Sequence, residues 1–463
     1  MRIAAISVAP LFPDLVIGGS QKILIDVAAG LNLSGHEVQI WCTGTKVHEG
    51  DFTIDGVTIH PQLALRGTFP ATHQVSPIEL AITADALRRA ADWGDRVYLH
   101  ADAVYLRHAL EGADIVRSIH DYVYEEALIS TLNLPAAATV VPSEYLKNCI
   151  EETVAISGRK TIEPVVVVPN GVLVPDTIPD PVLPKGIAPR GENDLILLFP
   201  HRPQAAKGLD VSIRVAVEMQ ADDPNRNVRL LMPVYTAGSS LDDAADSMAE
   251  LTKLVDSLGG NDIVEFHSWL SPSEMPGYYA AGDVTLCLGS FVESFGLVPV
   301  ESVANGTPVA CARVGALREF DGIDGIFLES YDWAPVTAHS VNLAITCSDD
   351  AIASGRAQIR AKYPMKSMIS GYESLLSESL VGERQITVVD GGRLALAPWC
   401  DIQGDQIYDD YRASRRIYRN VVRALRSSGG FIDVESSSNS AALDHEIKQA
   451  RIAGILIPEY EIA

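Results

Sequence analysis

The sequence at positions 293–301 reads Glu293-Ser294-Phe295-Gly296-Leu297-Val298-Pro299-Val300-Glu301 and closely follows the apolar run 284–288. The apolar run predicts a buried strand, and the quoted residues lead from its end into a helix. The two glutamates have seven residues between them, which places both carboxylates about two helical turns apart on one side of a cleft. Backbone N–H groups at the start of a helix favour an anion. The alternative is a capped helix with two solvated glutamates.

Short apolar runs alternate with helical periodicity over most of the chain. Fully apolar strands alternating with helices indicate a parallel sheet that is covered on both faces. A proline-rich stretch, 174–189, separates two such series and is interpreted as a linker. We therefore predict an α/β protein of two doubly wound units that face a cleft at the carboxyl ends of their strands. The strands expected are 3–8, 37–42, 96–99, 115–119, 139–141, 165–168, 195–199, 228–232, 263–266, 284–288 and 308–311.

The pattern changes in the last eighty residues. A strand over 385–396, helices over 408–426 and 444–452 and a short strand over 454–458 predict a small appended domain of winged-helix type. The first of these helices carries a stripe of arginines. The stripe is a solvated face, or docks onto Asp401, Asp405, Asp409 and Asp410, or binds an acceptor, a protein partner or nucleic acid. The stripe consists of Arg412, Arg415, Arg416, Arg419, Arg423 and Arg426.

Composition narrows the class of protein. The chain has 463 residues, with 36 Lys and Arg against 60 Asp and Glu, and a formal net charge of −24. This charge argues against nucleic acid or an anionic membrane as a partner of the whole chain, and a phosphorylated substrate would need a local cationic pocket. The six cysteines form no C-x-x-C pair and are expected to be buried free thiols. No signal peptide or membrane span is apparent, so we expect a cytoplasmic protein.

Several segments together resemble a known family. The run 293–301 resembles the E-x7-E signature of the retaining glycosyltransferase family 4, which has the GT-B fold. The resemblance covers about residues 1–380 and implies two Rossmann-like domains, an acceptor-side one over 1–183 and a nucleotide-sugar-binding one over 184–365. A helix over 366–382 crosses back to the first domain, and 383–463 is appended. The other matching segments, in the order of the family, are Ile17-Gly18-Gly19-Ser20, His120-Asp121, Val141-Pro142-Ser143-Glu144, Val168-Pro169-Asn170-Gly171-Val172, His201-Arg202 with Lys207-Gly208, Asn305-Gly306-Thr307-Pro308-Val309 and Val314-Gly315-Ala316-Leu317-Arg318-Glu319.

The resemblance implies a role for each matching residue. Arg202 and Lys207 would clamp the diphosphate of a nucleotide sugar, since a planar guanidinium and a compact ammonium suit phosphate oxygens. Glu301 would accept hydrogen bonds from the ribose hydroxyls, and Glu293 would hold the hydroxyls of the sugar. His120 would lie beside the reacting carbon, so that His120, Glu293, Arg202 and Lys207 form the catalytic set. The donor-binding set adds Gly18, Gly19, Ser294, Phe295, Gly296, Leu297 and Glu301 to Arg202, Lys207 and Glu293.

The implied reaction is sugar transfer with retention to a soluble acceptor, a small metabolite or natural product. Because the chain has no Asp-x-Asp motif, we expect neither a metal nor another cofactor. One departure from the family is His201 where a glycine usually precedes the arginine, which puts the shape of that loop in question. A non-catalytic sugar-nucleotide-binding protein and another GT-B activity, such as an epimerase, are the alternatives. The sequence leaves open the donor, the acceptor, the oligomeric state and whether a partner binds the appended domain.

Overall fold

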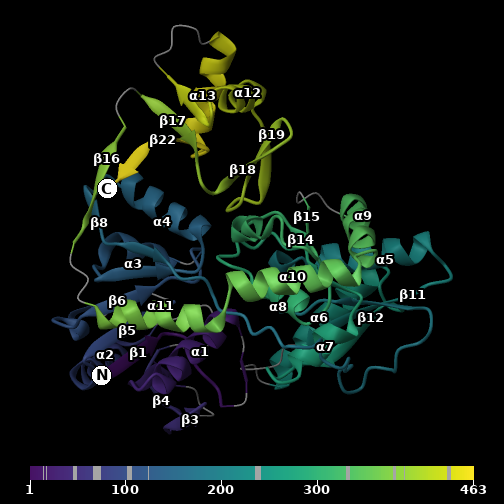
Figure 1. The fold of residues 1–463 in the computed structure, drawn as a ribbon, viewed down its shortest axis with the longest axis horizontal. Helices are drawn as coiled ribbons and strands as arrows, with labels where there is room; N and C mark the ends of the chain where they lie inside the picture. Colours follow the sequence, from purple (N-terminus) through teal and green to yellow (C-terminus); the bar gives the residue numbers. More distant parts are fainter. Residues whose placement is uncertain are drawn as a thin grey trace.

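A computed structural model of the protein describes most of the chain. The described residues are 1–13, 15–16, 18–44, 50–65, 75–101, 107–123, 125–234, 241–329, 334–378, 382–389, 392–434 and 440–463. Ile17, the first residue of the predicted Gly-Gly turn, lies outside them. Figure 1 shows two α/β units side by side, with a smaller region above the junction between them.

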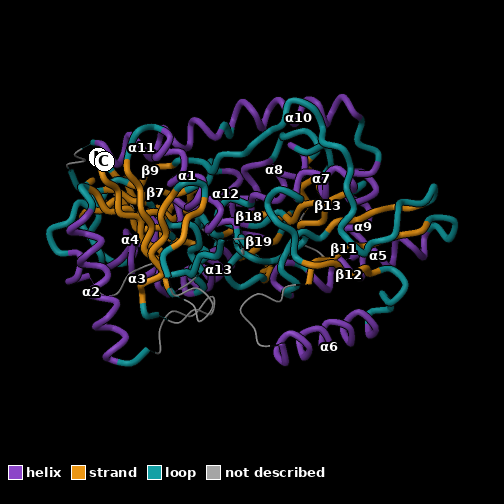
Figure 2. The backbone as a smooth tube through the Cα atoms, turned by 90° about the horizontal axis from the view of Figure 1, so that it is seen from below, coloured by secondary structure: helices purple, strands orange, loops and turns teal. Residues whose placement is uncertain are grey.

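The first unit is built on an eight-stranded sheet with the strand order β3-β4-β2-β1-β5-β6-β7-β9. All of its pairs are parallel except β3–β4, which form a hairpin at the edge. Its central strands are buried because helices cover both faces, as Figure 2 shows. The strands are β1 (Arg2–Ser7), β2 (Glu37–Thr43), β3 (Phe52–Ile54), β4 (Val57–Leu63), β5 (Arg96–His100), β6 (Ile115–Ser118), β7 (Ala138–Val141) and β9 (Val165–Val167). The helices are α1 (Gly19–Leu33), α2 (Pro77–Trp93), the 3-10 turn η1 (Arg107–Leu110), α3 (Glu125–Asn133) and α4 (Glu144–Ile156).

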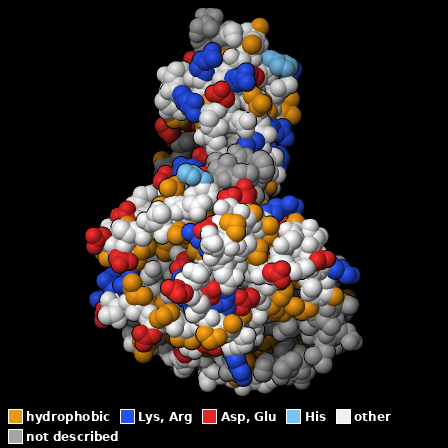
Figure 3. Space-filling view, turned by 90° about the vertical axis from the view of Figure 1, so that its right-hand side faces the viewer, with side chains coloured by type: hydrophobic (Ala, Val, Ile, Leu, Met, Phe, Trp, Pro, Cys, Tyr) orange, Lys and Arg blue, Asp and Glu red, His pale blue; other side chains and the backbone are white. Residues whose placement is uncertain are grey.

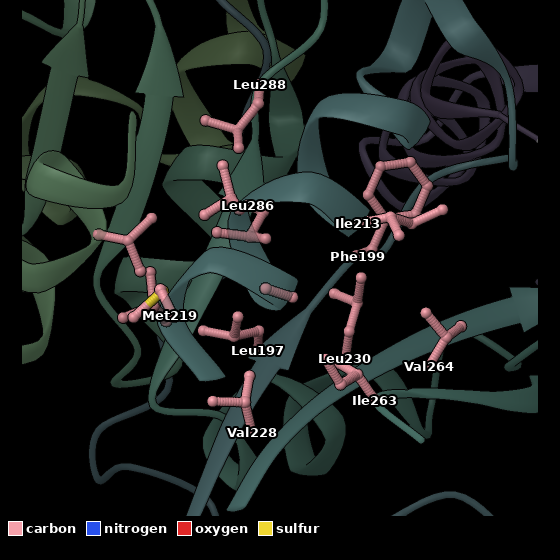
Figure 4. Close-up of a cluster of buried hydrophobic side chains, with 14 of the residues drawn as sticks. Leu197, Phe199, Ile213, Met219, Val228, Leu230, Ile263, Val264, Leu286 and Leu288 are labelled. Carbon is pink, nitrogen blue, oxygen red and sulfur yellow. The ribbon is translucent and has the colours of Figure 1, made fainter. Parts of the chain in front are cut away.

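The second unit has a six-stranded parallel sheet with the order β12-β11-β10-β13-β14-β15. Leu197 and Leu230 of this sheet, with Phe199 just after β10, form one apolar cluster with Ile213 and Met219, which is seen in Figure 4. The strands are β10 (Asp194–Leu198), β11 (Asn227–Val234), β12 (Val264–Ser268), β13 (Val284–Cys287), β14 (Val309–Ala312) and β15 (Ile326–Glu329). The helical elements are η2 (Ala205–Lys207), α5 (Leu209–Asp222), α6 (Leu241–Ser257), α7 (Met275–Ala281), α8 (Leu297–Ala304), η3 (Gly315–Phe320) and α9 (Ala334–Ile345).

The α/β architecture predicted from the sequence is confirmed. Each strand expected in the two units is present with bounds that differ by at most two residues, whereas the strand predicted over 385–396 is two strands, over 384–388 and 393–396. The edge hairpin β3–β4 and the strand β15 were not predicted. The six cysteines are free thiols, and all but Cys347 are buried, as expected. None of the helices that the structure describes is both long enough and apolar enough to cross a membrane.

Two helices follow the second sheet and return the chain to the first unit. α10 (Asp349–Lys362) packs beside α8, and α11 (Met365–Ser377) lies along α1. Tyr372 of α11 is buried edge-on against Tyr98 of β5, with 5.3 Å between ring centroids. Glu373 accepts a hydrogen bond of 3.1 Å from His36. The bounds of the four predicted domains stay predictions.

The appended region consists of small antiparallel sheets and two helices. Its first strand, β16 (Arg384–Val388), pairs with β8 (Thr161–Ile162) of the first unit and with the last strand, β23 (Tyr460–Ile462). The next sheet contains β17 (Arg393–Leu396), β21 (Phe431–Asp433) and β22 (Leu456–Pro458). The third contains β18 (Cys400–Gln403), β19 (Gln406–Asp409) and β20 (Ser414–Ile417). The helices are α12 (Arg419–Ser427) and α13 (Ala441–Ile452).

The prediction of one helix over 408–426 is wrong. Its first half forms β19, a turn with Ala413 at φ +44°, and β20, and only α12 is helical. Pairing with β18 buries Ile407 and Tyr408, and this tertiary pairing outweighs the helical spacing of the arginines. The winged-helix arrangement is absent from the described residues of this region, because five strands precede the first helix.

The arginine stripe is therefore divided. Arg412 pairs with Asp409, as the docking interpretation expects, whereas Asp401 and Asp410 pair with arginines of the second unit. Arg419, Arg423 and Arg426 are exposed along α12. Lys and Arg side chains gather on the narrow upper lobe in Figure 3, where the appended region lies.

Candidate functional site

A cavity of about 540 Å³ lies between the two α/β units, at the carboxyl ends of their strands. Residues from both units line it, and every predicted site residue is among them. The structure thus brings together segments that are nearly 300 residues apart in the sequence. The predicted residues at the cavity are Gly18, Gly19, His120, Arg202, Lys207, Glu293, Ser294, Phe295, Gly296, Leu297 and Glu301.

The first unit contributes the N-terminus of α1. Gly18 precedes this helix in an extended conformation, and a Cβ added at Gly18 would meet nothing within 4 Å. A Cβ at Gly19 would lie 3.0 Å from Leu297 Cδ1 of the second unit, so a small residue keeps the two walls close. The first-turn N–H groups of a helix have no partner within the helix, and α1 therefore offers an anion site at this wall.

His120 follows β6 and is buried at the floor of the cavity, beside the ring of His100 at a centroid distance of 4.6 Å. Burial lowers its pKa to about 4, so the imidazole is neutral near pH 7. Its Nε2 is buried and has no hydrogen-bond partner among the residues that the structure describes. A neutral ring with an unpartnered nitrogen at this position is suited to bind a polar group that enters the cavity.

Asp121, next to His120, also lines the cavity and was not among the predicted site residues. Burial, with a smaller contribution from Glu293, raises its pKa to about 7, although Lys207 and Arg202 act in the opposite direction. This carboxyl group therefore changes its charge near neutral pH. The residue pair His120-Asp121 gave no sign of this, because the charges that surround Asp121 come from the other unit.

Lys207 and Glu293 form an ion pair in the cavity. Lys207 Nζ lies 2.6 Å from Glu293 Oε1, and the two side chains are only 15% and 19% exposed. The ammonium also lies over the ring of Phe291, 3.8 Å from its centroid. A Cβ at Gly289 would lie 2.3 Å from the carbonyl oxygen of Ala206, so the Lys207 loop approaches the backbone after β13 closely. Arg202 lines the same wall.

The turn from Glu293 to Leu297 presents backbone to the cavity. Gly296 has φ +89°, a left-handed conformation that favours glycine, and it begins α8 without a side-chain cap. Its carbon faces Leu317, to which an added Cβ would come within 2.3 Å. The hydroxyl of Ser294 donates to the carbonyl oxygen of His120, which joins the two units at the floor. The N-terminus of α8 forms a second anion site facing that of α1.

Glu301 lies about one helical turn after Leu297, the first residue of α8, and its carboxylate accepts a hydrogen bond of 3.4 Å from the Tyr279 hydroxyl. Burial raises the pKa of Glu301, and Lys22 of α1 acts against this shift. Lys22 itself pairs with Asp26 at 2.6 Å. Lys22 and Tyr279 both line the cavity, and neither was predicted because neither belongs to a sequence motif. The roles assigned to the predicted residues stay predictions.

Part of the chain is similar in sequence to known proteins. Residues 185–350 match the family model described as glycosyl transferases group 1. The chain is 39% identical over 165 residues to the D-inositol 3-phosphate glycosyltransferase of Streptosporangium roseum, which is 35% of this chain and 37% of that protein. It is 38% identical over 143 residues to the enzyme of the same name from Thermobifida fusca, or 30% and 32% of the two chains. The chain thus matches about a third of the length of these relatives.

Solved structures share the fold over a longer part of the chain. Sucrose-phosphate synthase from Thermosynechococcus elongatus has a TM-score of 0.65 and 18% identity, and the match covers 81% of this chain and 98% of that one. Anabaena HepE in complex with UDP and glucose has a TM-score of 0.60 and 18% identity, with 81% and 99% covered. The chain has the GT-B fold.

Proposed function

We propose that the protein is a retaining glycosyltransferase that moves a sugar from a nucleoside-diphosphate sugar to a soluble acceptor. The observation that carries the proposal is the single cavity in which two helix N-termini, Arg202, Lys207, Glu293 and Glu301 meet. The match of residues 185–350 to group 1 glycosyl transferases supports it, because that segment includes these four side chains.

The cavity offers separate places for the parts of such a donor. The diphosphate carries two negative charges, which the N-termini of α1 and α8 and the side chains of Arg202 and Lys207 would hold. Glu301 is close to Lys22 and Tyr279 and would accept hydrogen bonds from the ribose hydroxyls. Glu293 and the backbone of 294–297 would bind the sugar. No metal is required in this scheme, because fixed cationic groups supply the charge.

The proposed reaction breaks the bond between the sugar C1 and the diphosphate oxygen. The acceptor hydroxyl oxygen bonds to C1 on the same face, and its proton passes to the departing diphosphate. Arg202, Lys207 and the helix N-termini stabilise the negative charge that develops on the leaving group. His120 stays neutral near pH 7, so its Nε2 can hydrogen-bond the sugar or the departing oxygen without adding charge.

The acceptor is proposed to be a small hydroxylated molecule. Two relatives carry the name D-inositol 3-phosphate glycosyltransferase, which points to a polyol of this size. A cavity of about 540 Å³ holds a donor or a small ligand of that kind, whereas a polymer would have to extend out of it.

The test is a thermal-shift screen of the nucleoside diphosphates and their common sugars, followed by assay of transfer to small polyols and their phosphates. A donor that binds the folded state specifically at a free concentration L stabilises the protein by RT ln(1 + L/Kd), so the unfolding temperature rises with the donor concentration. Arg202→Ala should reduce the shift at a given ligand concentration, while Lys253→Ala, a change at an exposed site on α6, should keep it. If no nucleotide or nucleotide sugar shifts the unfolding temperature, the proposed donor site is wrong. Binding without transfer to any acceptor would instead favour a non-catalytic binding protein.

A further inference from the structure

Asp410, in the appended region, is the side chain through which that region contacts both α/β units. It is buried, with 1% of its surface exposed. Tyr145 of the first unit donates to its Oδ2 at 2.8 Å. Arg318 of the second unit donates to both oxygens, from Nη1 to Oδ2 at 2.9 Å and from Nη2 to Oδ1. The backbone N–H of Gly315 is a further donor to this carboxylate. One carboxylate therefore holds three parts of the chain.

The partners of Asp410 in the second unit lead to the Glu293 turn. Gly315 and Arg318 belong to η3, and the next backbone N–H, that of Ala316, donates to the Glu293 carbonyl oxygen at 2.9 Å. Gly315 has φ +57°, and an added Cβ would lie 2.7 Å from the same oxygen. The backbone of η3 therefore packs directly against Glu293. The carboxylate of Glu293 accepts a hydrogen bond from Lys207 in the cavity.

Tyr145, the partner of Asp410 in the first unit, belongs to a helix that contacts Ser294, the residue after Glu293. Tyr145 lies in the first turn of α4, and its backbone N–H donates to Glu319 of η3 at 2.6 Å. The N-cap of α4, Ser143, donates from its hydroxyl to the carbonyl oxygen of Ser294 at 2.6 Å. Both arms of the Asp410 contact thus end on the backbone of 293–294, at the edge of the cavity.

We propose that Asp410 is a positioning residue that fixes the Glu293–Ser294 backbone, so that the appended region sets the affinity of the site for the sugar part of the donor. This inference rests on the proposed function for the identity of the ligand. The positioning itself concerns the protein alone and can be measured without any ligand. The appended region then shapes the site from outside the cavity, in contrast to a region that only recruits a partner.

The test compares Asp410→Asn with wild type in the full-length chain. The amide keeps the size of the side chain but loses the charge that Arg318 and Tyr145 contact. Asp444→Asn is the matched control, because Asp444 is exposed in α13 of the same region. Tyr145→Phe removes only one hydroxyl from the cluster and provides a milder variant should Asp410→Asn fail to fold.

Two measurements are made on each variant. Hydrogen exchange should become at least about tenfold faster in peptides covering 288–300 and 315–320, with the core strand β10 unchanged, since weakening a hydrogen bond to a charged group costs an equivalent free energy. Calorimetric titration should show about tenfold weaker binding of the nucleotide sugar, and a loss below about threefold for the nucleoside diphosphate alone. Tyr145→Phe should move both readouts in the same direction, and Asp444→Asn should move neither.

The outcomes separate the inference from the proposed function. Unchanged exchange at 288–300 in both cluster variants would overturn the positioning role. Equal losses of affinity for the nucleotide sugar and the diphosphate would also overturn it, since they would indicate general destabilisation. Faster exchange in a protein whose wild type binds no nucleotide sugar would keep the positioning role and refute the proposed function.

Discussion

The ion pair of Lys207 and Glu293 allows a prediction with two separable parts. At 2.6 Å and an effective dielectric constant of about 20, the Coulomb attraction is roughly 6 kcal/mol before desolvation is subtracted. Desolvation of two side chains that are less than a fifth exposed offsets most of this. Lys207→Met removes the ammonium that lies over the Phe291 ring and leaves the Glu293 carboxylate without its partner, at a net cost of about 1–3 kcal/mol. Nucleoside-diphosphate affinity should fall by roughly 10- to 150-fold, because one charged hydrogen bond to phosphate is lost.

The double variant Lys207→Met/Glu293→Gln separates the two effects. Replacing the unpaired carboxylate by an amide should recover most of the lost unfolding temperature, while the affinity for the nucleoside diphosphate should stay low. Thermal unfolding and calorimetric titration measure the two quantities, and Lys253→Met on α6 is the control. The reasoning is refuted if the double variant is no more stable than Lys207→Met, or if Lys207→Met binds the diphosphate as wild type does.

Three further predictions concern single residues of the cavity. Arg202→Ala should weaken nucleoside-diphosphate binding by at least about tenfold in titration, and equal affinity would exclude Arg202 from the phosphate site. Glu301→Ala should weaken binding of the nucleotide sugar but leave the affinity for free sugar phosphate unchanged. Equal losses of affinity for the two ligands would contradict contact between Glu301 and the ribose. The pKa of Asp121 is raised to about 7, so the folded state holds its proton more tightly than the unfolded state, and this contribution to stability is lost as pH rises from about 4 to about 7. The unfolding temperature of Asp121→Asn relative to wild type should therefore increase across this range, and a constant difference would show that Asp121 does not titrate there.

Much of the fold follows from short apolar runs, because buried parallel strands leave a local signal. The run at 284–288 corresponds to β13, and 3–8 corresponds to β1 with a shift of one residue. The residues after β13 also allowed a ligand site to be predicted, since a strand end followed by Gly296 and a helix is a local pattern. Such patterns are readable because the interactions that produce them lie within a few residues.

The features that the sequence did not predict depend on interactions between residues that are distant in the chain. The arginines at 412–426 have helical spacing, but the pairing of β19 with β18 buries Tyr408 and decides the conformation of the first half. The raised pKa of Asp121 depends on charges that approach from the other unit. The contacts of Asp410 join it to residues 92 and 265 positions earlier, and no spacing rule predicts such pairs.

The long separation of Asp410 from its partners along the chain bears on the timing of folding during synthesis. Tyr145 leaves the ribosome 265 residues before Asp410. At 5–20 residues per second this interval lasts roughly 13–53 s. Most of both α/β units is translated within this interval, before the guanidinium of Arg318 can pair with Asp410. The residues that line the cavity are therefore all translated before Asp410, the residue proposed to fix the Glu293–Ser294 backbone.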